Sequence, residues 1–250
     1  MKEYILKLLE KNERIDGRKL EEYRKIEIET GIIKKAEGSA RVRFGKTDVI
    51  AGVKIELSQP FSDMPNLGIL KTEAELIPLA SPEFEFGPPG EDATELARVV
   101  DRGIRESNSI DLEKLCLKEG EKVWGVFVDI DVINHDGNLI DASALAAIAA
   151  LLTSKMPELK DDKIVRESNK KLPVSHKPIT VTVGKINDKF IIDPIKEEEE
   201  VLDVKLSVAV MEDGKICAMQ KSGSKGLSQE DVGKMIDLAV KKSKELRKFL

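Results

Sequence analysis

The segment HDGNLIDASALAAIAALL (residues 135–152) follows the apolar run VWGVFVDIDVI (residues 123–133). A strand, a glycine turn and a helix form a common phosphate-binding arrangement, because free N–H groups at a helix N-terminus attract anions. This turn has one glycine and no Lys or Arg, and Asp136 and Asp141 flank it. The pattern therefore favours a structural role for this segment over a phosphate site. In that role the helix is capped by Asp141 or Ser143 and packs closely through its alanines.

A second group with chemical potential is a set of arginines in ELARVVDRGIRES (residues 95–107). Arg98, Arg102 and Arg105 stand at i, i+4 and i+7, so a helix would place them on one face. Guanidinium groups in line suit successive phosphates of a nucleic-acid backbone. The same segment carries three acidic salt-bridge partners: Glu95, Asp101 and Glu106. Residue types alone slightly favour the alternative, a solvated helix face held by ion pairs.

A third group is the acidic run Glu197–Glu200 with Asp203, at the entry to an expected strand. Clustered carboxylates can bind Mg²⁺ or act as general acids, but composition favours a solvated turn. The two histidines, His135 and His176, are isolated in the sequence, so surface or hydrogen-bonded roles are expected for them. We expect no metal and no cofactor, since the sequence has no CxxC pair, P-loop, dinucleotide fingerprint or nucleophile elbow.

Composition limits the class of protein. The chain has 250 residues, of which 41% are hydrophobic, enough for one large domain or two small ones. A net charge of −5 excludes a wholly basic nucleic-acid-binding surface but allows a local basic patch. Aromatic residues make up 4%, so few can stack on bases. Cys116 and Cys217 lie far apart, and neither a signal peptide nor a membrane-spanning run is found, which predicts a cytoplasmic protein without membrane contact.

These groups need elements to position them, and the first part of the chain predicts several. Apolar periodicity predicts a short N-terminal helix around residues 4–9. Alternation and turn residues predict strands and one hairpin over residues 23–30, 39–44, 49–57 and 72–79. Helices are expected over residues 91–107 and from residue 141 to about 156. The nearly continuous apolar run 123–133 predicts a strand covered on both faces.

The rest of the chain repeats the arrangement. A polar stretch over residues 160–171 suggests a boundary, which divides the chain into halves 1–165 and 166–250. The second half predicts two hairpins and a C-terminal helix, over residues 179–192, 201–220 and 228–250. We therefore predict a mixed α/β (α+β) fold of two similar halves, in which helices cover mixed sheets.

The order of these pieces resembles the RNase PH family. The segments, in chain order, are RIDGR (residues 14–18), GSARVRFGKTDVIAGVKIEL (38–57), ELARVVDRGIRES (95–107), VDIDVINHDGNLIDASALAAIAAL (128–151) and DPIKEEEEVLDVKLSVAVMEDGKICAMQKSG (193–223). Single motifs are weak, but the ordered set is specific and spans nearly the whole chain. Within the family, the chain more closely resembles the catalytically silent members of archaeal exosome rings.

The resemblance implies a function. Active members degrade RNA from its 3′ end with inorganic phosphate, and silent members alternate with a catalytic paralogue in a hexameric ring of three heterodimers capped by RNA-binding subunits. We therefore expect a non-catalytic subunit of a phosphorolytic 3′-to-5′ exosome ring that shapes its partner's active site and helps to bind RNA. The alternatives are an active phosphate-dependent 3′-to-5′ exoribonuclease and a scaffold without an RNA role.

The resemblance also implies roles for single residues. Active members carry a Gly-Thr-Arg-type turn that grips the attacking phosphate, and residues 136–141 lack that arginine. A phosphate dianion would have no counter-charge there, so no catalytic residue is assigned. Asp203 aligns with a catalytic aspartate of active members and Glu197 lies near a second acidic position, so both are candidates for vestigial catalytic residues. Three arginines become RNA-binding candidates: Arg98, Arg102 and Arg105.

Overall fold

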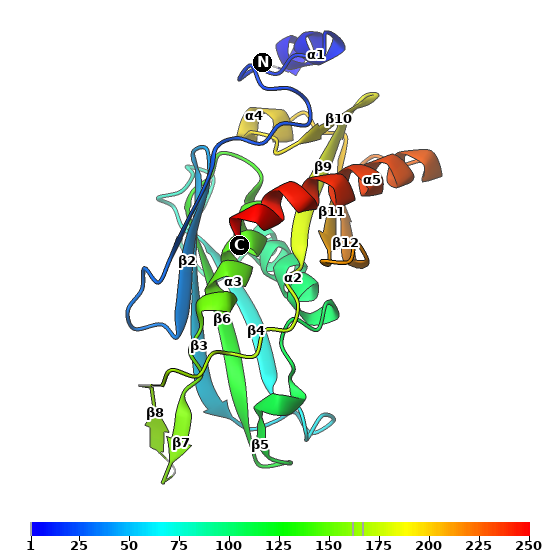
Figure 1. The fold of residues 1–250 in the computed structure, drawn as a ribbon. Helices are drawn as coiled ribbons and strands as arrows, with labels where there is room; N and C mark the ends of the chain where they lie inside the picture. The colour runs from blue at the N-terminus through cyan, green and yellow to red at the C-terminus, as the bar shows by residue number, and fades with distance from the viewer. Residues whose placement is uncertain (1, 162, 167) are drawn as a thin grey trace.

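The computed structural model describes residues 2–161, 163–166 and 168–250, which form two main β-sheets with helices between and beside them (Figure 1). The elements up to residue 153 are α1 (Lys2–Glu10), β1 (Ile26–Thr30), β2 (Gly38–Phe44), β3 (Thr47–Ser58), β4 (Ile69–Leu76), α2 (Glu91–Glu106), η1 (Glu113–Leu115), β5 (Cys116–Lys118), β6 (Lys122–Asn134) and α3 (Leu139–Thr153). The later elements are β7 (Glu158–Lys160), β8 (Lys163–Val165), β9 (Ile179–Ile186), β10 (Lys189–Ile192), α4 (Lys196–Glu199), β11 (Val204–Val210), β12 (Ile216–Ser222), α5 (Gln229–Leu246) and η2 (Arg247–Phe249).

The first sheet has the strand order β1-β2-β3-β6-β4, and the short β5 also pairs with β6. Its pairs are antiparallel except for β4 and β6, which run parallel. Alternate residues of β3, from Val49 to Ile55, are fully buried on the face that α3 covers. The period of two thus sets which face of the sheet joins the core.

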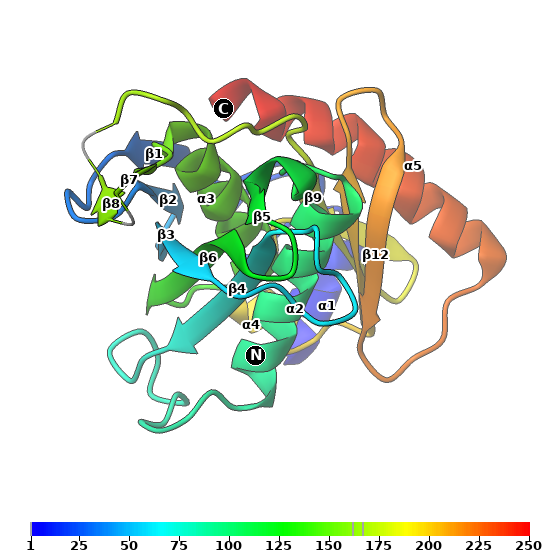
Figure 2. The ribbon, with the colours of Figure 1, turned by 90° about the horizontal axis from the view of Figure 1, so that it is seen from below.

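The second sheet is antiparallel, with the order β10-β9-β11-β12, and α5 packs against it. Helices α2 and α3 lie between the two sheets, as Figure 2 shows from below. The alanines of α3 allow this close approach. A Cβ added at Gly38 of β2 would collide with the carbonyl oxygen of Ala150 in α3. One hydrophobic core therefore runs from the first sheet through α3 to the second.

The predicted mixed α/β class is confirmed. The boundary near residue 165 stays a prediction. Strands β7 and β8 pair near the start of the polar stretch that suggested it. Residues 162 and 167 of that stretch lie outside the described residues. Helix α1 packs onto the second half of the chain, where Ile5 and Leu9 contact a small separate core with Ile186 and Ile191. None of the helices in the described part of the chain combines the length and apolar character that a membrane span requires.

The prediction that both faces of the strand over residues 123–133 are covered is wrong for most of its length. On one face of β6, alternate residues from Val126 to Val132 are buried. On the other face, Phe127 and Asp131 are half-buried and Asp129 is exposed. Sequence alternation from Val126 onward carries this signal, which the overall apolar character of the run obscured.

The predicted cap of α3 is also wrong. The N-cap position belongs to Asn138, which has a left-handed φ of 53° and makes no capping side-chain bond. Asp141 lies in the first turn and is fully buried against β9. Its Oδ2 accepts hydrogen bonds from Thr182 N at 3.0 Å and from Asn138 Nδ2 at 3.2 Å. Oδ1 has no partner, and burial raises the pKa of Asp141 from its ordinary 3.8 to about 7.

This raised pKa predicts that the free energy of unfolding depends on pH through Asp141, at the junction of α3 and β9. Because the folded protein keeps a proton on Asp141 that the unfolded chain loses near pH 4, stability falls as pH rises from about 4 to about 7. The stability difference between Asp141→Asn and the unmodified protein should therefore shift in favour of the variant by roughly 3 kcal/mol between pH 5 and pH 8. Urea denaturation at both pH values measures it.

The matched control is Asp63→Asn, the same change at an exposed loop residue. Any constant cost of the new amide cancels, because only the change with pH is compared. A difference between Asp141→Asn and the unmodified protein that is the same at pH 5 and pH 8 would rule out a protonated Asp141.

Candidate functional site

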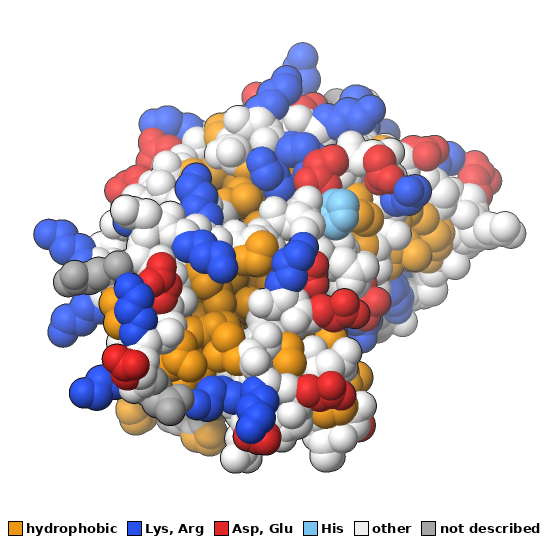
Figure 3. Space-filling model, turned by 60° about the horizontal axis from the view of Figure 1, so that its bottom comes forward, with side chains coloured by type: hydrophobic (Ala, Val, Ile, Leu, Met, Phe, Trp, Pro, Cys, Tyr) orange, Lys and Arg blue, Asp and Glu red, His pale blue; other side chains and the backbone are white. Residues whose placement is uncertain are grey.

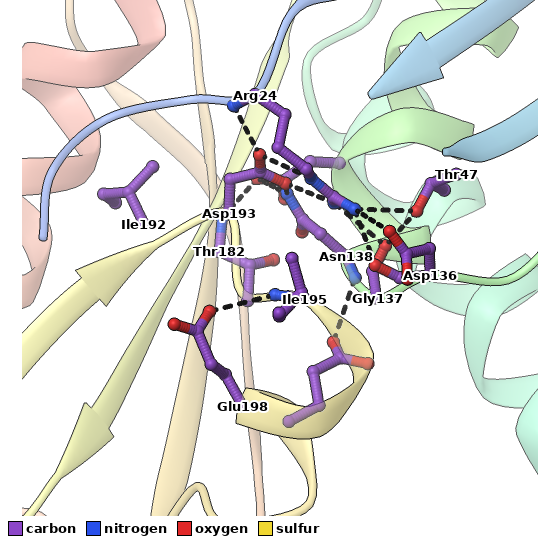
Figure 4. Close-up of polar contacts among 12 residues, drawn as sticks. Arg24, Thr47, Asp136, Gly137, Asn138, Thr182, Ile192, Asp193, Ile195 and Glu198 are labelled. Atoms are coloured by element: carbon purple, nitrogen blue, oxygen red, sulfur yellow. Dashed lines mark hydrogen bonds and ion pairs between the residues drawn. The ribbon is translucent and has the colours of Figure 1, made fainter. Parts of the chain in front are cut away.

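The turn between β6 and α3 is held by backbone fit and by side chains from other segments. Gly137 has a φ of 85°, and a Cβ there would collide with the carbonyl oxygen of Pro194. Thr47 Oγ1 donates to the Gly137 carbonyl at 2.7 Å. Arg24 Nη1 donates to the Asp136 carbonyl at 2.6 Å. The turn is thus fixed between the first sheet and the segment that follows β10 (Figure 4).

The buried carboxylate of Asp193 is the centre of this arrangement. It accepts from Arg24 Nη2 at 2.6 Å, from Arg24 Nε at 2.9 Å and from Arg24 N at 2.8 Å. Arg18 Nη1 and Asn138 Nδ2 each donate at 3.0 Å. Burial alone would raise the pKa of Asp193, but the bonds and charge of Arg24, aided by the charge of Arg18, hold that pKa below its ordinary value. Figure 4 shows Asp193 between Arg24 and Asn138.

The acidic run 197–200 is not simply the solvated turn that composition favoured. Most of it forms α4, and Glu198 is fully buried in an ion pair with Arg14, whose Nε lies 2.9 Å from Oε1. The neighbouring Glu199 turns toward α3, where its Oε1 accepts from Asn138 N at 3.1 Å.

The N-terminus of α3 therefore already holds an anion of its own. A negative charge is favourable at this end of a helix, and Glu199 supplies it. Arg24, the arginine that contacts this turn, is committed to Asp193 and to the turn carbonyls. A phosphate at Asn138 would be repelled by the carboxylate of Glu199, which already accepts from the backbone N–H. Arg24 could not neutralise it, because Arg24 is paired with Asp193.

A cleft of about 220 Å³ lies beside this helix end and is lined in part by Glu199, Lys205, His135 and Phe84. Lys205 Nζ is 4.0 Å from Glu199 Oε1, so its charge is partly matched. His135 stacks on Phe84 with ring centroids 5.4 Å apart, and burial lowers its pKa. The cleft thus holds a neutral imidazole and a paired lysine.

The two vestigial candidates do not line this cleft. Asp203 accepts from Asn187 N at 2.8 Å and pairs with Lys225 Nζ at 2.8 Å. Partial burial would raise its pKa, but the bonds from Lys225 and Asn187 more than compensate, so the pKa of Asp203 is lowered. Glu197 is half-buried on α4 and directly precedes the buried Glu198 in the sequence. Within the described residues no three His, Cys, Asp or Glu side chains gather as a metal site.

The three arginines of α2 separate into two kinds. Arg98 and Arg102 are exposed and line a groove of about 660 Å³ between α2, the loop before it and Gln220 of β12. Neither has an ion pair or hydrogen bond among the residues that the structure describes. Arg105 instead pairs with Asp101 at 2.9 Å and donates to the Leu70 carbonyl at 2.8 Å. Of the helical salt bridges that the sequence allowed, only this one forms in the described structure.

Arg24 and Asp193 were not among the candidate residues that the sequence indicated, and Glu199 was included only as a member of the acidic run, without its role at the turn. Their partners lie far along the chain, so no local spacing connects them. A partial signal was available. Arg14 and Arg18 lie in the segment 14–18, and Asp193, Glu198 and Glu199 lie in the segment 193–223, both of which carry the family resemblance. Arg24 lies outside these segments.

Comparison with known proteins shows which family this chain is similar to. Residues 22–157 match domain 1 of the 3′ exoribonuclease family (RNase PH), and residues 176–242 match its domain 2. The chain is 50% identical over 250 residues to a protein of Methanothermobacter thermautotrophicus named "Exosome complex component Rrp42", covering 98% of this chain and 92% of that protein. A Thermococcus gammatolerans protein of the same name is also 50% identical, covering 100% of this chain and 93% of its own length.

Solved structures agree with the sequence comparison. A chain of a structure titled "archaeoglobus fulgidus exosome with RNA bound to the active site" superposes with a TM-score of 0.93 at 47% identity, covering 99% of this chain and 96% of that chain. A chain of "Archaeal exosome core" gives a TM-score of 0.89 at 44% identity, covering 99% and 95%. Two matched family domains in the expected order and near-full-length relatives lead to one conclusion: the chain belongs to the 3′ exoribonuclease family, the RNase PH family that its ordered motifs resemble.

Proposed function

We propose that this chain is a non-catalytic subunit of a phosphorolytic 3′-to-5′ exosome ring, where it shapes the active site of a catalytic paralogue and contributes to RNA binding. Relatives with half of its residues in common are named as an exosome component. One structural relative belongs to an exosome with RNA bound. The ring would alternate the two paralogues as three heterodimers and carry RNA-binding cap subunits. A cytoplasmic location fits its two free cysteines.

The contact between Glu199 and Asn138 N carries the non-catalytic part of the proposal. Phosphorolysis needs a bound phosphate dianion, and preorganised positive charge is what holds such a nucleophile. Here a carboxylate occupies the helix N-terminus, and Arg24 pairs with Asp193 instead. Without a phosphate position, a nearby acid has no nucleophile to assist.

The alternative, an active exoribonuclease, also lacks a suitable acid. Asp203 is paired with Lys225 and its pKa is lowered, so it is ionised at neutral pH and cannot donate a proton. It also lies outside the cleft at the N-terminus of α3. The pairing of Asp203 with Lys225 and its position outside this cleft therefore support the non-catalytic proposal over an active enzyme.

Arg98 and Arg102 support the RNA-binding part. They are exposed, one helical turn apart, and neither pairs with Glu91 or Glu95, the two carboxylates that also line the groove, so both guanidinium groups are available to the phosphates of a single strand. Positive charge elsewhere is interspersed: on the face in Figure 3, Lys and Arg surround a central group of hydrophobic side chains with Asp and Glu among them. RNA contact through a local patch agrees with the net charge of −5.

The first prediction is that the isolated chain does not degrade RNA in a phosphate-dependent way. The purified chain, the catalytic paralogue and their mixture are each incubated with labelled RNA, with and without inorganic phosphate. Nucleoside diphosphates should be released by the mixture and not by this chain alone. Release by this chain alone at a rate comparable to that of the mixture would show that it is an enzyme.

The second prediction separates the arginines of α2. Arg98→Ala with Arg102→Ala should weaken RNA binding by the assembled ring on the order of tenfold or more, since two charged contacts are lost. The slope of log affinity against log salt should become shallower by roughly 1.4, because each phosphate contact to a single strand contributes about 0.7. Fluorescence anisotropy over a salt series measures both quantities.

Arg105→Ala is the matched control, because Arg105 is held by Asp101 and the Leu70 carbonyl. It should leave the affinity and the salt slope nearly unchanged while lowering the stability of α2 against β4. If the double variant keeps full affinity and slope in an intact ring, RNA does not contact this groove.

A further inference from the structure

The outer face of the first sheet is the face away from the core. Helices α2 and α3 pack on the inner face, and none of the helices in the described residues covers the side chains of the outer face. Strand register sets their neighbours. On β1, β2 and β3 the charges are matched: Arg41 pairs with Asp48 at 2.6 Å, and Arg43 pairs with Glu29 at 2.9 Å.

The other side of this face carries unmatched negative charge. In the parallel pairing of β4 and β6, Glu73 stands opposite Asp129 and Glu75 opposite Asp131. We call these four side chains the acidic ladder. Lys71 pairs with Glu73 at 2.6 Å. For the other three members the described residues provide no ion pair.

Like charges directly opposite one another on neighbouring strands destabilise a sheet. The effect is visible in the titration of the ladder. Partial desolvation on the sheet surface and then the charges of Glu73 and Glu75 raise the pKa of Asp129, although Lys71 opposes them. Burial and then the charges of Glu75 and Asp129 raise the pKa of Asp131. The fold thus retains a repulsive arrangement that, within the described chain, Lys71 relieves only in part.

An apolar stripe of three side chains, Ile33, Ile50 and Phe127, borders the ladder. Ile50 stands opposite Asp131 on the next strand. Ile33 is 40% exposed and reaches over Gly52, where an added Cβ would lie 3.9 Å from its Cδ1. Phe127 is half-buried on β6, two residues before Asp129. The sheet face therefore offers apolar contact area directly beside an acidic row of which one member, Glu73, has an ion-pair partner among the described residues.

We propose that the acidic ladder and the apolar stripe form a docking surface for the neighbouring RNase PH-like subunit of the ring, which contacts it through Lys or Arg side chains set among apolar ones. The inference rests on the ring role proposed above and assigns a surface to it. Cations from the neighbour would relieve the repulsion in the ladder, while the stripe would lose its exposure to water.

Charge excludes two other occupants. RNA phosphates would be repelled by four carboxylates, so this face is not a nucleic-acid path. A second copy of this chain would bring the same acidic ladder to the contact and add to the repulsion. Only a surface of opposite charge gains from docking here.

The test neutralises part of the ladder without changing its shape. Asp129→Asn with Asp131→Asn removes two like charges and is expected to fold at least as stably as the unmodified chain. Its affinity for the purified catalytic paralogue, measured by sedimentation over a salt series, should fall on the order of tenfold at low salt, with a shallower dependence on salt. Glu113→Gln with Glu119→Gln removes two exposed charges elsewhere and should behave like the unmodified chain.

Carboxyl labelling with a carbodiimide gives a second readout. Assembly with the paralogue should protect Asp129, Asp131 and Glu75 from labelling and leave Glu113 reactive. If the unmodified chain assembles with the paralogue, yet the ladder stays reactive and the variant binds as tightly as its control, the docking surface is wrong and the ring role stands. If the unmodified chain does not assemble with the paralogue at all, the ring role fails and the docking surface fails with it.

Discussion

The carboxylate of Asp193 is the interaction on which the arrangement of this protein depends. It is fully buried, and an ion there is tolerable only because donors surround it. These donors come from the N-terminal segment, through Arg18 and Arg24, and from the turn before α3, through Asn138. Through Arg24 the same contact extends to the carbonyls of Asp136 and Gly137. One side chain at the end of β10 thus connects three segments and orients α3 between the sheets.

The same arrangement decides what chemistry the turn can perform. Arg24 donates to the carbonyls of the turn, and its ion pair with Asp193 leaves it unavailable to a phosphate. Glu199 occupies the backbone N–H of Asn138, so negative charge is already present where a phosphate would bind. The helix N-terminus is used for structure, while exposed cations remain one helix away, at Arg98 and Arg102 on α2. The proposal of RNA binding without catalysis rests on this separation of charge.

Local patterns predicted much of the fold and part of the site. The hairpin around Gly45 and the face of α2 that carries Arg98 and Arg102 follow from periods of two and 3.6 residues, which a sequence displays directly. The cap of α3 did not follow, because Asp141 faces β9, whose Thr182 is 41 residues away in the chain. The role of Glu199 was equally hidden, since its partner Asn138 is 61 residues distant. Composition alone predicts that an acidic run is solvated, because the donors that bind its carboxylates come from distant parts of the chain.

The most direct test of the central claim is an NMR titration of the isotope-labelled chain with inorganic phosphate, following the amide signals of Gly137 and Asn138. If Glu199 occupies the helix N-terminus, these signals should show only the small, unsaturated shifts that exposed amides show with rising salt, and a sodium chloride series should reproduce them. Saturable shifts confined to Gly137, Asn138 and their neighbours would show that phosphate binds at this turn. The account of a chain that binds RNA without attacking it would then be contradicted.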